Sequence, residues 1–197
     1  MRSRFISGLT GAGLVLALAT QAQAAWEMVP GESEITADVA GENQRGPVER
    51  TYHVSDLAGI ISDDGYFEMP LRLEQTDLLG NNGLGGLLAG LSSDSAMATL
   101  STQIDPAWLS NLAPGDSITR TLEMTARGNH FERSEEVPLR VERLDNESWQ
   151  VSLAEPVTVD TRQLMQLDNA QTILSLLGYQ SLEESIPIRF DARLVDR

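Results

Sequence analysis

The sequence predicts an all-β protein whose antiparallel strands close on themselves as a barrel, with one or two short helices. Three observations lead to this expectation. Apolar residues alternate with polar ones in many short segments, turn-forming residues separate these segments, and helical periodicity is rare. Many one-sided strands joined by hairpin turns bury their apolar faces best in a sheet that closes or folds over.

Residues 1–24 have the organisation of a secretory signal peptide. Two arginines precede the apolar segment Leu9–Ala19, and residues 22–24 form the A-x-A pattern that marks a cleavage site. The apolar segment is short and interrupted by glycines, so it is poorly suited to span a bilayer. We therefore expect export to the periplasm, with no stable membrane insertion after cleavage, and a single domain over residues 25–197.

The composition excludes several kinds of chemistry. The 197 residues include 29 acidic and 14 basic side chains, for a formal net charge of −15, and all the basic residues are arginine. Without residues 1–24 the charge is −17, because that segment holds two arginines and no acidic residue. Such a charge repels phosphates, so we expect no nucleic-acid partner. The lack of cysteine and lysine excludes disulfides, thiolate nucleophiles, zinc–thiolate sites and Schiff-base lysines.

Strands are expected wherever the alternation persists. It is clearest near the C-terminus, where Arg189, Asp191 and Arg193 separate apolar residues. The expected strands include Ile35–Val39, Phe67–Leu73, Ile118–Met124, Val137–Val141, Trp149–Leu153 and Ile186–Leu194. Turn-forming residues at 63–65, 114–116, 127–129 and 144–146 punctuate the chain between them.

Helical signals are confined to two places. Asp105 and the proline after it can start a turn or two of helix over Ala107–Leu112. A stronger helix is expected over Asp168–Gly178, where Asp168 or Asn169 can cap the start and the glycine can end it.

A set of short motifs runs through the chain in a recognisable order. They are Trp26-x-x-x-Pro-x-x-Ser33-x-Ile35, Leu57-Ala-Gly59-x-Ile61, Asp64-Gly65, Trp149-x-Val151, Pro156-Val-Thr-Val159, Leu176-Leu-Gly178 and Ser185-Ile-Pro187-Ile188-x-Phe190. By order and spacing, the chain resembles the YceI-like, polyisoprenoid-binding domain family from Trp26 to Val195. One departure is the glycine-rich segment Leu78–Leu91, which stands where many relatives have an Arg-Asp pair and a leucine. This segment is compatible with a lid, a loose helix or a docking surface.

The resemblance implies a lipocalin-like antiparallel barrel with a tunnel that holds a long-chain lipid as its ligand. At any one position a core residue is the simpler interpretation, and only the whole set of alternating residues indicates a cavity. From the alternation and the architecture of the family, we expect the tunnel to be lined by Phe67, Met69, Leu71, Leu122, Met124, Leu139, Val151, Ile188 and Phe190.

Energetics narrow the class of ligand. Burial contributes about 0.8 kcal/mol per CH₂ group, against an association cost of about 4–15 kcal/mol. Chains much shorter than about ten carbons would therefore bind weakly. The negative charge of the protein disfavours a pyrophosphate head, so we expect a neutral or weakly polar one.

Nothing in the sequence points to an enzyme. His53 and His130 lie in strand-like segments without metal-ligand spacing, and the pair Asp63-Asp64 is explained by turn chemistry. No serine-hydrolase elbow is present. We expect neither a catalytic residue, nor a metal, nor a cofactor other than the bound lipid.

Three functions remain open from the sequence. The first is a periplasmic protein that binds an isoprenoid, a quinone or a fatty acyl compound for transport, storage or stress response. The second is a protein–protein interaction module of the cell envelope with a filled barrel. The third, an enzyme acting on a lipid in the tunnel, lacks a nucleophile–base pair. The sequence leaves open whether two copies form a homodimer.

Overall fold

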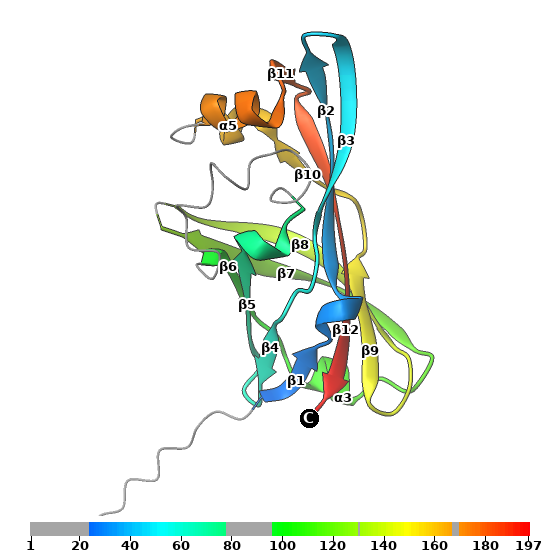
Figure 1. Cartoon of the computed structure of the whole chain (residues 1–197). Coiled ribbons are helices and arrows are strands. Elements are labelled where there is room, and N and C mark those ends of the chain that lie inside the picture. Colours follow the sequence, from blue (N-terminus) through cyan, green and yellow to red (C-terminus); the bar gives the residue numbers. More distant parts are fainter. Residues whose placement is uncertain (1–23, 78–95, 130, 167–169) are drawn as a thin grey trace, which may run out of the picture.

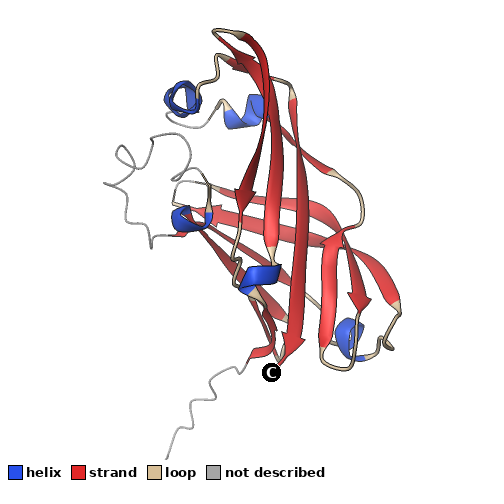
Figure 2. Ribbon diagram, turned by 45° about the vertical axis from the view of Figure 1, so that its right-hand side comes forward, coloured by secondary structure: helices blue, strands red, loops and turns tan. Residues whose placement is uncertain are grey.

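The computed structural model describes residues 24–77, 96–129, 131–166 and 170–197, which form an antiparallel β-barrel with a few short helices, as predicted (Figures 1 and 2). Eight strands close the ring, because the last of them pairs back onto the first. In ring order they are β1 (Ala24–Met28), β4 (Ile60–Ser62), β5 (Tyr66–Arg72), β6 (Ala96–Gln103), β7 (Ser117–Gly128), β8 (Glu132–Arg143), β9 (Ser148–Leu153) and β12 (Ser185–Asp196).

Further strands extend the barrel wall beyond the ring. They are β2 (Glu34–Asn43), β3 (Gly46–Val54), β10 (Val157–Asp160) and β11 (Ser181–Leu182). Along one edge, β12 pairs with β9 and then β10, and along the other edge with β1 and then β2. The β2–β3 hairpin therefore projects past the ring, at the top of Figure 1.

The two predicted helices are present. The first is α3 (Ala107–Ser110), where the Asp105 carboxylate accepts a hydrogen bond from the Ala107 N–H at 3.0 Å. The second is α5 (Ala170–Leu177), which Gly178 ends with a φ of +83°. Its predicted caps, residues 168 and 169, lie outside the described residues, as does the segment 78–91. Short helical turns also occur at α4 (Thr161–Leu164), η1 (Pro30–Glu32) and η2 (Leu73–Gln75).

The predicted inward and outward faces are confirmed along β12. Ile186, Ala192 and Leu194 are buried, whereas Arg189 and Asp191 are exposed. Because side chains alternate along a strand, the same pattern of inward and outward residues holds over the whole length of β12. This strand therefore presents a continuous apolar face to the interior.

A bend held by Ser33 connects the strands that pair with one edge of β12. Ser33 is only 3% exposed, and its hydroxyl donates a hydrogen bond to the Val29 carbonyl at 2.8 Å. The same hydroxyl oxygen accepts from the Arg193 backbone N–H at 3.3 Å. The Arg193 guanidinium also pairs with Glu32 at 2.9 Å. Ser33 therefore ties the bend between β1 and β2 to β12.

Two tryptophans pack together inside the barrel near α3. The rings of Trp26 and Trp149 meet edge to face, with centroids 6.2 Å apart and an interplanar angle of 87°. The Trp149 indole N–H donates to the Leu109 carbonyl at 3.1 Å, and the Arg143 guanidinium lies 5.0 Å from the Trp149 ring centroid. These contacts fasten α3 to the barrel.

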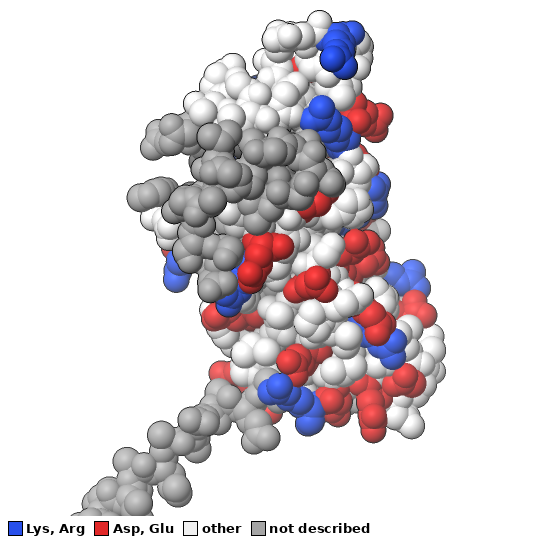
Figure 3. Space-filling model, viewed as in Figure 1, with Lys and Arg blue, Asp and Glu red and all other residues white. Residues whose placement is uncertain are grey.

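Acidic side chains are spread over the face seen in Figure 3, with arginines between them. One of the ion pairs joins β12 to β2, where Arg189 lies 2.7 Å from Asp38. The hydrogen bond that Asp38 accepts from the Thr51 hydroxyl, and then its contact with Arg189, lower the pKa of Asp38 below its ordinary value of 3.8.

We predict that Ser33→Ala lowers the free energy of unfolding by about 1–2 kcal/mol, because a buried hydrogen-bonding group is lost at the bend. Urea unfolding followed by circular dichroism measures this change. Ser117→Ala, at the exposed start of β7, is the control and should change stability by less than about 0.5 kcal/mol. Equal effects of the two variants would mean that Ser33 does not hold the bend.

We also predict that Asp38→Asn destabilises the protein at neutral pH but not in strong acid. Since the pKa of Asp38 is lowered by folding, its ionised form stabilises the fold above pH 3.8. That contribution disappears as the pH falls through the lowered pKa. Melting temperatures from pH 7 to pH 2 should show the two curves converging below pH 3.8. Asp63→Asn, in the exposed turn before β5, is the control. A constant gap at all pH values would contradict the prediction.

Candidate functional site

The barrel encloses a cavity of about 190 Å³. Side chains from strands around the whole ring line it, together with Trp108 and Leu109 of α3. Along β12 the lining extends from Ile188 to Leu194, which corresponds to about 20 Å at a strand rise of about 3.3 Å per residue. The cavity is therefore elongated along the strands.

Eight of the nine predicted tunnel residues lie around this cavity. They are Phe67, Met69, Leu122, Met124, Leu139, Val151, Ile188 and Phe190. Leu71 is the exception, since it is half-buried and packs against the core without lining the cavity. Leu71 shares the parity of Phe67 and Met69, and the register between β5 and β6 shifts only after it, so alternation gives its face but not how far along β5 the cavity reaches. That these residues contact a ligand stays a prediction.

The lining also contains residues that the sequence did not predict to face the cavity. They include Met28, Ile35, Ile61, Leu100, Thr102, Ile104, Trp108, Leu109, Arg120, Val137 and Val157. The sequence could have predicted Arg120 as a lining residue, because Arg120 shares the parity of Leu122 and Met124 on β7. Trp108 could not, because it belongs to a short helix that does not follow strand alternation.

The cavity wall is apolar apart from Thr102 and Arg120. The Thr102 hydroxyl donates to the Glu123 carbonyl at 2.8 Å and is therefore already satisfied. Within the described part of the chain, no carboxylate or histidine lines the cavity. A wall of this composition offers hydrogen bonds to a ligand only at these two residues.

A tyrosine cluster anchors α5 to the β2–β3 hairpin outside this lining. Arg50 donates to the Leu177 carbonyl at 2.5 Å, and its guanidinium lies 5.3 Å from the Tyr179 ring centroid. Burial, and then the hydroxyl of Tyr52 at 3.5 Å, raise the pKa of Tyr179. The Tyr179 hydroxyl also donates to the Val39 carbonyl at 3.3 Å. The cluster therefore holds α5 in place, and its residues do not line the cavity.

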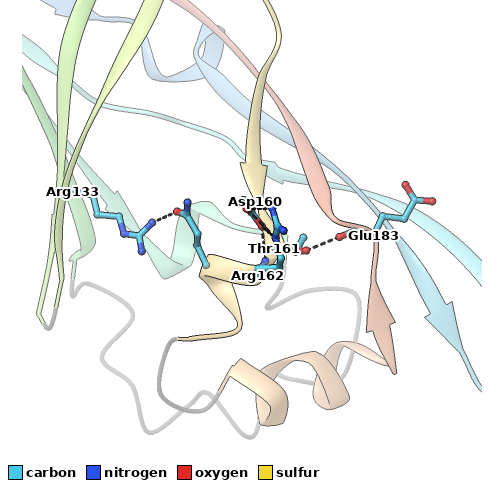
Figure 4. Close-up of polar contacts among 6 residues, drawn as sticks. Arg133, Asp160, Thr161, Arg162 and Glu183 are labelled. Carbon is cyan, nitrogen blue, oxygen red and sulfur yellow. Dashed lines mark hydrogen bonds and ion pairs between the residues drawn. The ribbon is translucent and has the colours of Figure 1, made fainter.

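A polar contact joins β8 to α4 beyond the cavity (Figure 4). Arg133 donates a hydrogen bond to the side-chain carbonyl of Gln163. Asp160 begins α4 by accepting from the Arg162 backbone N–H at 2.9 Å. The buried Thr161 donates to the Glu183 carbonyl at 2.7 Å. This polar network connects the barrel wall to the segment that carries α4.

The histidines and acidic residues of the described chain do not gather into a metal site. Among the described residues, no group of three or more histidine, aspartate or glutamate side chains could hold a metal ion. His53 lies on β3 with its Nδ1 3.6 Å from Glu34, on the exposed surface, and His130 lies outside the described residues. In the same part of the chain, no helix is long and apolar enough to cross a membrane.

This chain is similar to known proteins in its fold. The sequence matches no family model and no curated protein. The fold is similar to that of a polyisoprenoid-binding domain from Saccharophagus degradans implicated in plant cell wall breakdown, with a TM-score of 0.74 and 17% identity. That match covers 89% of this chain and all of the other.

A second solved structure, BcnA from Burkholderia cenocepacia, matches with a TM-score of 0.51 and 12% identity, over 82% of this chain and 95% of that one. At these identities the likeness is one of fold. It confirms, at the level of the fold, the resemblance to the polyisoprenoid-binding family that the motifs indicated.

Proposed function

We propose that this protein binds a long-chain apolar lipid, such as an isoprenoid, a quinone or a fatty acyl compound, for transport, storage or stress response. The observation that carries the proposal is the elongated apolar cavity inside the barrel. A barrel of eight strands either fills its interior with side chains or holds one small ligand. An interaction module with a filled barrel would have no such space, so the cavity favours the lipid-binding function.

The size of the cavity indicates how the chain would bind. Its volume of about 190 Å³ is below the range of about 300–1,000 Å³ that is usual for ligand pockets. Met28, Met69 and Met124 all line it. Methionine side chains are unbranched and change rotamer readily, so they can widen the cavity around an incoming chain.

The chemistry proposed is binding without a covalent step. General acid–base catalysis needs a titratable group within hydrogen-bond reach of the substrate. Arg120 is the one charged residue among the lining residues described, and no carboxylate or histidine stands beside it in that lining. Desolvation of the chain and the shape of the tunnel would therefore select the ligand. We propose no resident cofactor.

The proposed location is the periplasm. The signal-peptide pattern of residues 1–24 supports it. Strand β1 starts at Ala24, where the cleavage pattern ends, so a chain cut after that residue would lose almost nothing of the barrel.

We predict that Met124→Trp weakens lipid binding by about tenfold or more, because the indole occupies space that the chain needs. Binding is followed with cis-parinaric acid, a long-chain fatty acid that becomes fluorescent in apolar surroundings. The matched control is Glu123→Trp, which places the same side chain on the exposed outer face. Circular dichroism checks that both variants fold.

The control variant should bind like the unmodified protein. Equal affinity of the Met124 variant, the Glu123 variant and the unmodified protein would show that the chain does not enter this cavity. If none of the three proteins bound the fatty acid, the proposed function itself would be contradicted.

A further inference from the structure

Arg120 is the one charged residue among the described residues that line the apolar cavity. It lies on β7 with the parity of Leu122, and it pairs across the sheet with Leu139. Yet Arg120 is exposed, unlike these two buried neighbours. A long arginine stem can line apolar surface while its guanidinium reaches water. The cavity therefore meets the solvent at Arg120.

The surroundings of Arg120 leave most of its donors unused. The guanidinium lies 5.6 Å from the Trp108 ring centroid, so the aromatic ring supports it from one side. The Arg120 guanidinium donates a hydrogen bond to the neighbouring Thr119 carbonyl at 3.0 Å. Across the described ranges, Arg120 takes part in no ion pair.

Other arginines near the barrel are already engaged. Arg143 donates to three backbone carbonyls, and Arg133 donates to Gln163 of α4. Neither lines the cavity. The combination of a cavity-lining position, free donors and an aromatic support is thus particular to Arg120.

We propose that Arg120, resting on Trp108, binds the carboxylate head of a single-chain fatty acid whose tail occupies the cavity. This inference rests on the proposed function and adds the chemical class of the head group. A guanidinium has five N–H donors in a planar fork that matches a carboxylate, and charge assistance strengthens those bonds. One arginine balances one negative charge.

The charge of −17 on residues 25–197 had led to the expectation of a neutral head, and the local geometry modifies that expectation. Exposed charges farther away than about 10 Å are largely screened at 0.1 M salt, whereas Arg120 would touch the head directly. A pyrophosphate carries more charge than one arginine can balance, so it stays disfavoured.

The test compares hexadecanoate with 1-hexadecanol, which has the same chain and a neutral head. Each ligand displaces the neutral dye Nile red from the protein at pH 8. The unmodified protein should bind hexadecanoate more tightly than the alcohol by about threefold to tenfold at about 0.1 M salt. The preference should shrink as NaCl is raised.

Arg120→Gln should remove the preference, which is read as the ratio of the two affinities, so that a change in the cavity that affects both ligands alike cancels. Arg120→Lys should retain part of it, because the charge stays while the planar fork is lost. Trp108→Leu should reduce it, since the ring positions the guanidinium. Arg133→Gln is the matched control, because it removes an arginine outside the lining and should keep the full preference.

Equal binding of acid and alcohol by the unmodified protein would overturn this inference while leaving lipid binding intact. A preference that survives in Arg120→Gln would also overturn it. Failure of both ligands to displace the dye would instead argue against the proposed function.

Discussion

The structure depends on the pairing of β12 along both of its edges. Its twelve residues hydrogen-bond with β9 and β10 on one side and with β1 and β2 on the other. This double pairing closes the ring and leaves no free edge there, since a strand edge without a partner exposes unpaired N–H and C=O groups. Closure also commits every second residue of β12 to the interior, so the apolar face must be continuous.

A closed barrel can either fill its interior with side chains or leave a cavity for a ligand, and the composition favours a cavity. Only 5% of the residues are aromatic, and two of the three tryptophans, Trp26 and Trp149, pack against each other near α3. Much of the remaining wall is leucine, isoleucine, valine and methionine, with fewer ring systems to fill the centre. Space is thus left along the strands, while the polar groups that fasten the bend at Ser33 lie away from the cavity wall. Ser33 can therefore stabilise the bend without contacting the cavity.

Much of the barrel could be predicted from sequence because strand alternation is a local property. The inward faces of β7, β8 and β12 follow directly from their apolar spacing. Leu71 shows where this reasoning ends, since it has the parity of the lining residues Phe67 and Met69 but lies outside the cavity, and alternation does not reveal how far along β5 the cavity reaches. Trp108 shows a second limit, because α3 is held in place by a bond between Trp149 and Leu109 forty residues apart. The projecting β2–β3 hairpin likewise depends on contacts with distant β11 and β12.

The central claim is that the barrel holds one long chain, and native mass spectrometry tests it most directly. The mature protein would be purified from a periplasm without detergent, and its bound material would be extracted into organic solvent and identified. The account predicts a discrete long-chain species at close to one per barrel. A ligand-free mass that stays unchanged after incubation with isoprenoids and fatty acyl compounds would contradict it.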